Sequence, residues 1–266
     1  MVVMEEPLLQ NPAISIVICS IDAEKFKAVS QTYADALAGE SYELIAIHDA
    51  KSLAEGYNRG IAQSRGSIVV FSHDDIEILT PDFARKLRNY LNVYDIVGVA
   101  GTTCLIDAKW LAAGHPHVHG NVTHQLGPSG EFEVTVYGAR STVVKHAQAL
   151  DGLFFAVRRK VLDTLQFDAA IFDGFHCYDV DFTFSAFQKG FKLAVCNDLT
   201  LIHRSAGRFD ESWERYRERF VAKHGARLAN KPPRDAMLAS LRVRTRAEVL
   251  ACCTPETLGE ASRRLA

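Results

Sequence analysis

Hydrophobic and polar positions over residues 1–100 alternate between two patterns. Short apolar runs rich in β-branched residues are separated by longer amphipathic stretches. This alternation is typical of parallel strands joined by crossover helices. We expect strands at Ala13 to Ser20, Tyr42 to His48, Ser67 to Ser72 and Asp95 to Ala100. We expect helices at Asp22 to Leu37, at Ser52 to Ser64 and at Thr80 to Asn92, the last with Thr80 as N-cap and Pro81 as its first residue.

The pattern changes after the fourth expected strand. From Gly101 to His146 the chain is rich in Gly, His and Pro and has no clear period, which predicts an irregular insertion. Regularity then returns, with a strand at Leu153 to Val157, helices at Arg158 to Leu165, Asp179 to Gln188 and Asp210 to His224, and a strand pair or one bent strand at Lys192 to His203. Beyond Gly225 we expect helices near Pro233 to Val243 and after Thr254-Pro255.

These elements predict one α/β domain over residues 13–225, with a mostly parallel central sheet flanked by helices. Residues 1–12 are expected to form an N-terminal extension, and residues 226–266 a helical tail. A chain of 266 residues is long enough to bury the core of such a domain.

Composition and charge narrow the class of protein. The chain is 48% hydrophobic and 23% charged, as ordinary globular proteins are, which excludes a disordered or low-complexity chain. Its 30 basic and 32 acidic residues leave no positive excess, so no nucleic-acid partner is expected. No apolar run reaches the ~20 residues of a transmembrane segment and the N-terminus lacks a basic signal region, so we expect a cytoplasmic protein. The six cysteines lack CxxC spacing and are expected to be reduced.

The first candidate site is the segment Phe71-Ser72-His73-Asp74-Asp75-Ile76-Glu77, where a histidine and acidic groups follow an apolar strand. Ligands of open parallel sheets bind beyond the carboxyl ends of the strands. Adjacent carboxylates repel one another unless a cation lies between them, which favours a divalent metal ion. The alternative is a loop with solvated acids.

Three further segments carry candidate chemistry. Asp179 and Asp181 stand at the start of an expected helix, either as acids favoured by the helix dipole or with one of them as a general base. His203 follows the apolar Leu201-Ile202, either as a structural residue or as a ligand. The histidines from His115 to His124 suit a metal cluster less well than a mobile polar loop over an active site, because Gly and Pro surround them.

Common motifs of other enzyme classes are missing. GxGxxG does not follow the first expected strand, and the sequence has neither a P-loop GxxxxGK[ST] nor the GxSxG of serine hydrolases. A dinucleotide-binding fold, a P-loop enzyme and a serine hydrolase are therefore disfavoured.

Taken in order, these segments resemble a family 2 glycosyltransferase with the GT-A fold, over about Ala13 to Gly225. The resemblance lies in the strand Ile14 to Ser20, in Asp49, in the stretch Ala54 to Gly66 with Asn58, in Asp74-Asp75, in Asp151 to Arg159 and in Tyr178-Asp179-Val180-Asp181-Phe182. Two positions depart from the family pattern. His73 replaces the first acid of the DxD motif, a His-Asp-Asp variant also found in a bacterial branch of the family, and Tyr178 replaces the Glu before the catalytic Asp.

The resemblance implies a transfer of a sugar from a nucleoside-diphosphate donor, with UDP the first choice, to a hydroxyl group of a carbohydrate or other acceptor, with inversion. It implies Mn²⁺ or Mg²⁺ at Asp75 and His203, and a nucleotide-sugar half at about 13–100. The acceptor half would be at about 101–225, with Asp179 as the catalytic base. The donor would contact Ser20, Asp49, Asn58 and Asp74, and the acceptor would contact Asp151 and Gly152. Trp110 stands at the entry of the expected loop, either as a flat face on which an acceptor sugar ring stacks or as a partly buried anchor of the loop base.

Two other functions stay open at this point. A catalytically inactive domain that binds nucleotide sugars or acts as a scaffold would keep the same fold. A nucleotidyltransferase of similar architecture would carry a Gly-rich phosphate loop after the first strand, where this chain has Ile21-Asp22-Ala23-Glu24.

Overall fold

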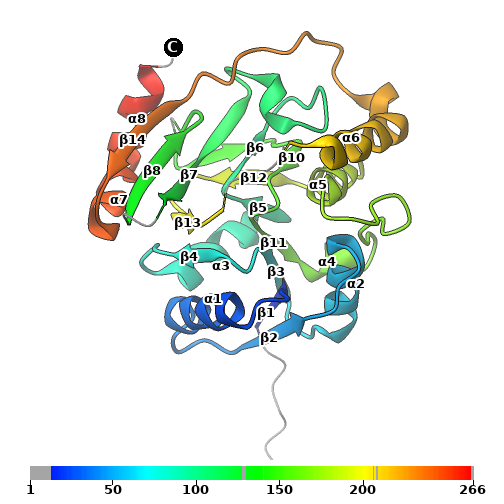
Figure 1. The fold of residues 1–266 in the computed structure, drawn as a ribbon, viewed down its shortest axis with the longest axis horizontal. Coiled ribbons are helices and arrows are strands. Elements are labelled where there is room, and N and C mark those ends of the chain that lie inside the picture. Colours follow the sequence, from blue (N-terminus) through cyan, green and yellow to red (C-terminus); the bar gives the residue numbers. More distant parts are fainter. Residues whose placement is uncertain (1–12, 128–129, 140, 206, 208, 265–266) are drawn as a thin grey trace, which may run out of the picture.

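The computed structural model describes residues 13–127, 130–139, 141–205, 207 and 209–264, and two β-sheets organise them (Figure 1). The first sheet has seven strands in the order β2-β1-β3-β11-β5-β12-β9. In chain order these are β1 (Ile14–Cys19), β2 (Tyr42–Ile47), β3 (Ile68–Ser72), β5 (Ile96–Gly98), β9 (Val143–Lys145), β11 (Phe154–Arg158) and β12 (Leu193–Cys196). All but β9 and β11 run in one direction, because β1, β2 and β3 are parallel and β11 is antiparallel to both of its neighbours. The expected mostly parallel sheet is therefore confirmed.

Helices flank this sheet, as expected. They are α1 (Ala23–Ala36), α2 (Leu53–Gln63), α3 (Phe83–Val93), α4 (Arg159–Leu162), α5 (Tyr178–Gln188) and α6 (Glu211–His224), with the short 3₁₀ turns η1 (Trp110–Ala113) and η2 (Gly225–Arg227). Side chains close the helix starts where the sequence predicts them, since Asp22 accepts from the backbone of Glu24 and Lys25 and Ser52 accepts from Glu55.

One expected helix start is wrong. Helix α3 begins at Phe83 with Asp82 in the capping position, not at Thr80-Pro81. The Thr80 hydroxyl instead accepts a hydrogen bond of 2.6 Å from the Thr200 backbone N–H. Thr80 therefore ties the approach to α3 to the start of β13, a contact between residues too distant in sequence for a local pattern to reveal.

Strands of the second sheet run through the segment in which the sequence predicts no regular structure. Its order is β10-β6-β7-β13-β4, and β8 pairs with β7 and with β14. The strands are β4 (Ile76–Ile78), β6 (Ala100–Thr102), β7 (Val118–Leu126), β8 (Glu131–Val136), β10 (Ala149–Leu150), β13 (Leu201–His203) and β14 (Ala239–Val243). The expectation of an irregular insertion at Gly101 to His146 is thus wrong. The hydrophobic pattern does not predict strand β7, because two of its buried positions carry the polar residues Asn121 and Thr123, which are 2% and 0% exposed.

The C-terminal segment packs against the second sheet (Figure 1). β14 lies antiparallel to β8, so the helix expected near Pro233 to Val243 is wrong. Two helices follow, α7 (Arg246–Cys252) and α8 (Pro255–Arg263), and α8 starts after Thr254 as the sequence predicts. Phe132, Val134, Val249 and Leu258 form part of a second apolar cluster there. Residues 226–266 therefore contribute a strand to the sheet as well as helices.

An aromatic cluster fills the space between the first sheet and α5. The Phe167 and Phe182 rings stack at 4.2 Å, and Phe71, Tyr57 and Tyr178 pack around them. This rigid packing fixes the start of α5 relative to the end of β3. Within the described ranges, no helix combines the length and the apolar character needed to cross a membrane.

Candidate active site

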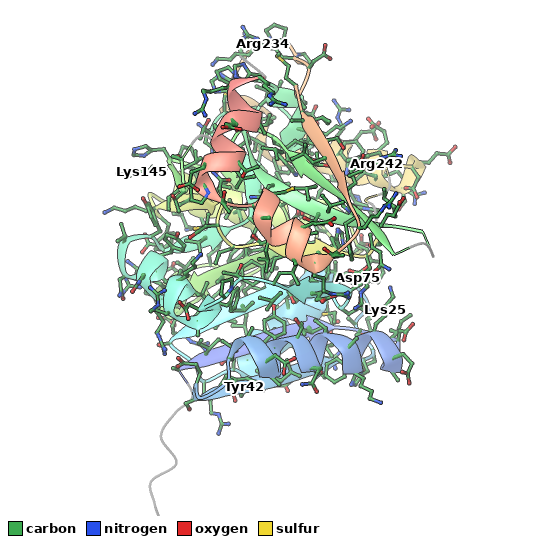
Figure 2. The ribbon with its side chains drawn as sticks, turned by 90° about the vertical axis from the view of Figure 1, so that its left-hand side faces the viewer. Lys25, Tyr42, Asp75, Lys145, Arg234 and Arg242 are labelled. Atoms are coloured by element: carbon green, nitrogen blue, oxygen red, sulfur yellow. The ribbon has the colours of Figure 1, made fainter. Side chains whose placement is uncertain are left out.

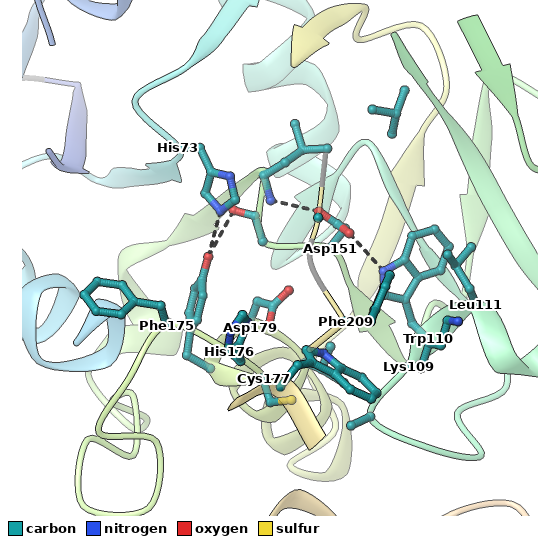
Figure 3. Close-up of a pocket in the computed structure, with 18 of the residues that line it drawn as sticks. His73, Lys109, Trp110, Leu111, Asp151, Phe175, His176, Cys177, Asp179 and Phe209 are labelled. Carbon is teal, nitrogen blue, oxygen red and sulfur yellow. Dashed lines mark hydrogen bonds between the residues drawn. The ribbon is translucent and has the colours of Figure 1, made fainter. Parts of the chain in front are cut away.

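A cavity of about 250 Å³ lies where the two sheets meet, and Figure 3 shows much of its lining. It collects side chains from distant parts of the chain: His73 after β3, Asp151 between β10 and β11, Asp179 on α5 and His203 on β13. Of the residues that the sequence singled out, Trp110, Asp151, Gly152, Asp179 and His203 line this cavity. The fold therefore brings half of the predicted site residues to one place.

Three potential metal ligands cluster at one edge of the cavity. Donor atoms of His73, Asp75 and His203 all lie within 4.8 Å of one another. His203 Nε2 lies 3.2 Å from His73 Nδ1 and 3.2 Å from Asp75 Oδ1. The sequence predicts Asp75 and His203 as ligands and places His73 in the same candidate segment, but as a departure from the DxD pattern and without a ligand role. The imidazole itself was the available signal, since it keeps a donor atom at that position.

The geometry of this cluster fits a divalent cation. Two donor atoms bonded at ~2.1 Å to one ion, at angles near 90–110°, lie about 3.0–3.4 Å apart. His203 Nε2 has this spacing to both His73 Nδ1 and Asp75 Oδ1. Asp75 Oδ1 is buried and has no hydrogen-bond partner of good geometry in the part of the chain that the structure describes. A buried carboxylate oxygen without such a partner is costly, and a cation would satisfy it.

The protonation states of the cluster also suit a metal. Burial alone would raise the pKa of Asp75, but the neighbouring His203 holds it well below the usual range, so Asp75 is ionised. Burial and then the charge of His203 lower the pKa of His73, so its imidazole is neutral at neutral pH. A carboxylate and a neutral imidazole are the forms that bind metal ions. The Tyr178 hydroxyl lies 3.1 Å from His73 Nε2 and orients the ring.

Asp179 faces the same cavity from the first turn of α5. The helix starts after Cys177, which adopts a left-handed conformation with φ of 61° and has no side-chain cap. Burial and then the charge of Asp151 raise the pKa of Asp179 to about 7. A carboxyl group with a pKa near neutrality can accept and release a proton under working conditions, as a general base must.

Asp181 has a structural role, although it lies only two residues after Asp179 on α5. Its carboxylate is 2% exposed and contacts His224 at 2.7 Å and Lys223 at 2.8 Å, both on α6. This pairing anchors α5 to α6. The helix turn thus separates the two acids, with Asp179 toward the cavity and Asp181 toward the neighbouring helix.

Gly152 allows the chain to pass close to Asp179. A Cβ atom at Gly152 would lie 2.5 Å from the Tyr178 hydroxyl and 2.9 Å from Asp179 Oδ2, distances that real side chains do not reach. Only glycine therefore fits here without moving the start of α5.

Gly152→Ala is accordingly expected to destabilise the protein by about 1–3 kcal/mol, the usual cost of overpacking, measured by urea unfolding. Gly225→Ala is the matched control, because a Cβ there meets only Val221 Cγ1 at 3.6 Å. Equal stability of the two variants would show that the close approach at Gly152 imposes no constraint.

The residues expected to bind a donor fall into two groups. Ser20 and Asp74 follow β1 and β3, whereas Asp49 follows β2 and Asn58 lies on α2. Ser20 donates a hydrogen bond of 2.6 Å to Asp74, and the Lys25 ammonium lies 4.0 Å from Asp74 and 3.9 Å from Asp75. Figure 2 shows Lys25 close to Asp75 at one end of α1. Ser20, Asp74 and Lys25 therefore adjoin the candidate metal ligands. Lys25 was not predictable from a local motif, because its neighbours Asp74 and Asp75 lie about 50 residues further along the chain.

Asp49 and Asn58 have partners of their own. Asp49 is exposed and forms a 2.7 Å ion pair with Arg59. The Asn58 amide donates to the Phe167 carbonyl and accepts from the Phe167 N–H, which ties α2 to the chain before α5. Neither residue lies among those that line the cavity.

Trp110 is mostly buried, with 8% of its surface exposed. Its indole N–H donates to Asp151 at 2.9 Å, and its ring packs edge-on against Tyr137. The second Asp151 oxygen accepts from the Leu153 N–H. Trp110 thus fixes Asp151, the residue whose charge acts on Asp179.

The histidines between His115 and His124 do not form a cluster of their own. His119 contacts the Gly138 carbonyl and the Thr103 hydroxyl, whereas the His124 ring lies 5.6 Å from the His203 ring. The expectation of a mobile polar loop here is wrong, because residues Val118–Leu126 form β7. Among the described residues, the metal-type grouping found is His73, Asp75 and His203.

A cavity with a metal-type cluster at one edge and a buried carboxyl group across it has the groups to hold a cation and to accept a proton. Residues 15–224 match the sequence model of a family described as glycosyltransferase-like. The match covers most of the chain, and the protein belongs to this family.

No curated protein matches the sequence. Among solved structures, a mannosyltransferase from Pyrobaculum calidifontis in complex with GDP-Man and Mn²⁺ has a TM-score of 0.49 and 12% identity, over 97% of this chain and 74% of that one. GalNAc-T7 with UDP, GalNAc and Mn²⁺ has a TM-score of 0.45 and 11% identity, over 77% and 45% of the two chains. A197 from STIV has a TM-score of 0.40 and 12% identity, over 74% and 98%. These likenesses are distant.

Proposed function

We propose that this protein is a metal-dependent glycosyltransferase that moves a sugar from a nucleoside-diphosphate donor, UDP first among the candidates, to an acceptor hydroxyl group with inversion. The observation that carries the proposal is the placement of His73 and His203, two members of the metal-type cluster, in one cavity with Asp179. We also propose that His73-Asp74-Asp75 is a variant of the DxD motif and that the protein belongs to the bacterial branch of the family that carries this variant. Residues 13–100 would bind the donor, and residues 101–225 the acceptor.

On the donor side, His73, Asp75 and His203 would hold Mn²⁺ or Mg²⁺. Bound there, the cation would offset the negative charge that develops on the departing diphosphate. Lys25 adds a second positive charge beside Asp74 and Asp75. Ser20 and Asp74 would contact the donor next to the ligands, and Asp49 and Asn58 would contact it further along β2 and α2.

On the acceptor side, Asp179 would remove the proton of the attacking hydroxyl group. The oxygen then forms a bond to the anomeric carbon of the donor sugar, while the bond from that carbon to the diphosphate oxygen breaks. The diphosphate leaves with the electron pair, and the proton stays on Asp179 until solvent takes it. Attack opposite to the leaving group inverts the anomeric carbon. Asp151, Gly152 and Trp110 would position Asp179 and the acceptor.

The pH dependence of transfer tests the role of Asp179. Because only the carboxylate form accepts a proton, kcat/KM is expected to rise with pH to a plateau, with its midpoint at about 7, the pKa that burial and then Asp151 give Asp179. Asp151→Asn removes the neighbouring charge, so the midpoint is expected to move to lower pH. A rate that is constant across neutral pH would contradict this assignment.

The proposal as a whole is tested by binding and turnover together. UDP with Mn²⁺ is expected to raise the melting temperature, since a ligand at ~100 times its Kd adds about 2.7 kcal/mol of stability. Screening of nucleotide sugars with acceptor extracts, measured by release of nucleoside diphosphate, is expected to show turnover. Binding without turnover would favour the catalytically inactive domain, and no binding of any nucleotide would exclude the donor site.

A further inference from the structure

A second cavity collects positive charge. Its volume is about 330 Å³, and its lining comes from α3, the start of β3, the end of β11 and the start of α4. The lining includes no acidic residue and four cationic ones, Arg88, Arg158, Arg159 and Lys160, in a chain whose net charge is −2. A concave site with one sign of charge attracts ligands of the opposite sign. We call this site the basic cavity.

The basic cavity is separate from the candidate active site, and no described residue lines both. Ile68 starts β3 and lines the basic cavity, whereas His73 follows the other end of β3 and lines the active-site cavity. β11 runs antiparallel to β3, with Arg158 opposite Ile68. Five residues of extended chain span about 17 Å, so a small ligand in the basic cavity would not touch the candidate metal ligands.

Two of the four cations have acidic partners. Arg88 pairs with Glu40, and Lys160 pairs with Asp95. Neither acid is among the residues that line the cavity. These two ion pairs therefore place N–H donors at the cavity wall but add no net charge.

The other two cations keep their charge. Arg159 donates to the Gly66 carbonyl at 2.7 and 2.9 Å and to the Ser64 hydroxyl at 2.9 Å, and these acceptors are neutral. The Arg158 side chain is partly buried and has no hydrogen-bond or ion-pair partner in the described part of the chain. Its backbone is fixed at the end of β11, where its N–H donates to the Asp95 carbonyl at 2.9 Å. A partly buried guanidinium without an acidic partner is costly, and a bound anion would satisfy it.

The charge and the donors of the basic cavity fit a phosphate group. Two uncompensated positive charges match the charge of about −1.5 to −2 that a phosphate monoester carries near neutral pH. Guanidinium groups present N–H donors in a planar fork that fits phosphate oxygens. The exposed side chain of Asn92 in the lining offers a further N–H donor. A single carboxylate would leave one of the two charges without a partner.

We propose that the basic cavity binds a phosphate group at Arg158 and Arg159, apart from the candidate active site. Inorganic phosphate, pyrophosphate and the headgroup of an anionic lipid share this chemistry. The proposal is independent of the proposed sugar transfer, because none of the expected donor, acceptor or metal-binding residues lines this cavity.

Binding is measured without divalent ions, in buffer that contains EDTA, so that a metal at the candidate active site does not capture the phosphate. Inorganic phosphate and pyrophosphate are the soluble probes, titrated by calorimetry at constant ionic strength because salt screens charges. Vesicles of phosphatidylcholine with or without phosphatidic acid, measured by flotation, are the lipid probes. At least one phosphate probe is expected to bind in a saturable way, and the probe that binds identifies the source.

Variants connect this binding to the cavity. Arg158→Gln is expected to raise the Kd of the bound probe by about tenfold or more, because it removes an uncompensated charge. Arg158→Lys keeps the charge and is expected to recover part of the affinity. Arg85→Gln is the matched control, because Arg85 lies on α3 and pairs with Asp82 but does not line the cavity, so the Kd is expected to change less than twofold. The Arg158 side chain has no partner to lose, so its variants are expected to melt as the parent does.

Three results would overturn the proposal: no phosphate probe binds, vesicles bind equally with and without phosphatidic acid while the soluble probes do not bind, or Arg158→Gln binds as the parent does. Lys25→Gln provides the comparison at the other site, since Lys25 lies beside Asp74 and Asp75. Loss of phosphate binding in Lys25→Gln but not in Arg158→Gln would assign the anion to the candidate donor site and contradict the basic cavity.

Discussion

Asp179→Asn is expected to lower the turnover of sugar transfer by ~10²–10⁴-fold, the range for loss of a general base. The amide has nearly the shape of the carboxyl group but cannot accept the proton. Affinity for UDP and Mn²⁺ is expected to stay near that of the parent, because Asp179 is not among the candidate ligands His73, Asp75 and His203. Single-turnover transfer and calorimetric binding of UDP measure the two effects separately.

The same substitution is expected to stabilise the fold at alkaline pH. Burial and then Asp151 raise the pKa of Asp179 from 3.8 to about 7, so the folded protein favours the protonated acid. The contribution of Asp179 to stability is full below its unfolded pKa and is lost as the pH rises through the folded pKa. An asparagine has no charge to bury, so the variant is expected to melt above the parent at a pH higher than about 7.

Asp181→Asn is the matched control, since it makes the same change on the same helix. Its carboxylate pairs with Lys223 and His224, so the variant is expected to melt lower than the parent. If Asp179→Asn keeps full turnover, or if Asp181→Asn alone abolishes turnover per folded molecule, the base is misassigned.

Asp75→Asn is expected to weaken Mn²⁺ binding by about 100-fold or more, because it neutralises the single carboxylate of the cluster. Titration of free Mn²⁺ by electron paramagnetic resonance measures this loss directly. The melting shift produced by UDP is expected to lose its dependence on Mn²⁺ in the same variant.

Asp74→Asn is the control for charge at this edge. Asp74 is adjacent in sequence and contacts Ser20 and Lys25, but it is not part of the cluster. Its variant is therefore expected to bind Mn²⁺ within about tenfold of the parent. Parent-like Mn²⁺ binding by Asp75→Asn would place the metal elsewhere.

The sequence predicted the parts of the fold that local periodicity determines. Strands β1 to β3 and helices α1 and α2 repeat apolar positions at regular spacing and have polar caps, so their positions could be read directly. Strand β7 could not, because Asn121 lies at a buried position and bonds the Asn197 carbonyl, a partner far away in the chain. β14 likewise exists because β8 pairs with it.

The residues of the candidate site likewise divide into those that a local pattern predicts and those that depend on contacts between distant segments. Asp75, Asp179 and His203 were recognisable because each lies at or next to an end of a regular element. The participation of His73 depends on its distance to His203, which is 130 residues away in the sequence.

The three candidate ligands also link metal binding to assembly of the protein. His73 and Asp75 follow β3 of the first sheet, while His203 ends β13 of the second sheet. In an unfolded or half-folded chain these groups are separated by a long loop whose closure costs entropy, so the ligand set exists only after both sheets have formed and joined. A bound ion would therefore report correct assembly. A chain whose second sheet is wrongly packed against the first would bring neither the metal ligands nor the cavity residues together, and it would bind no metal at this position.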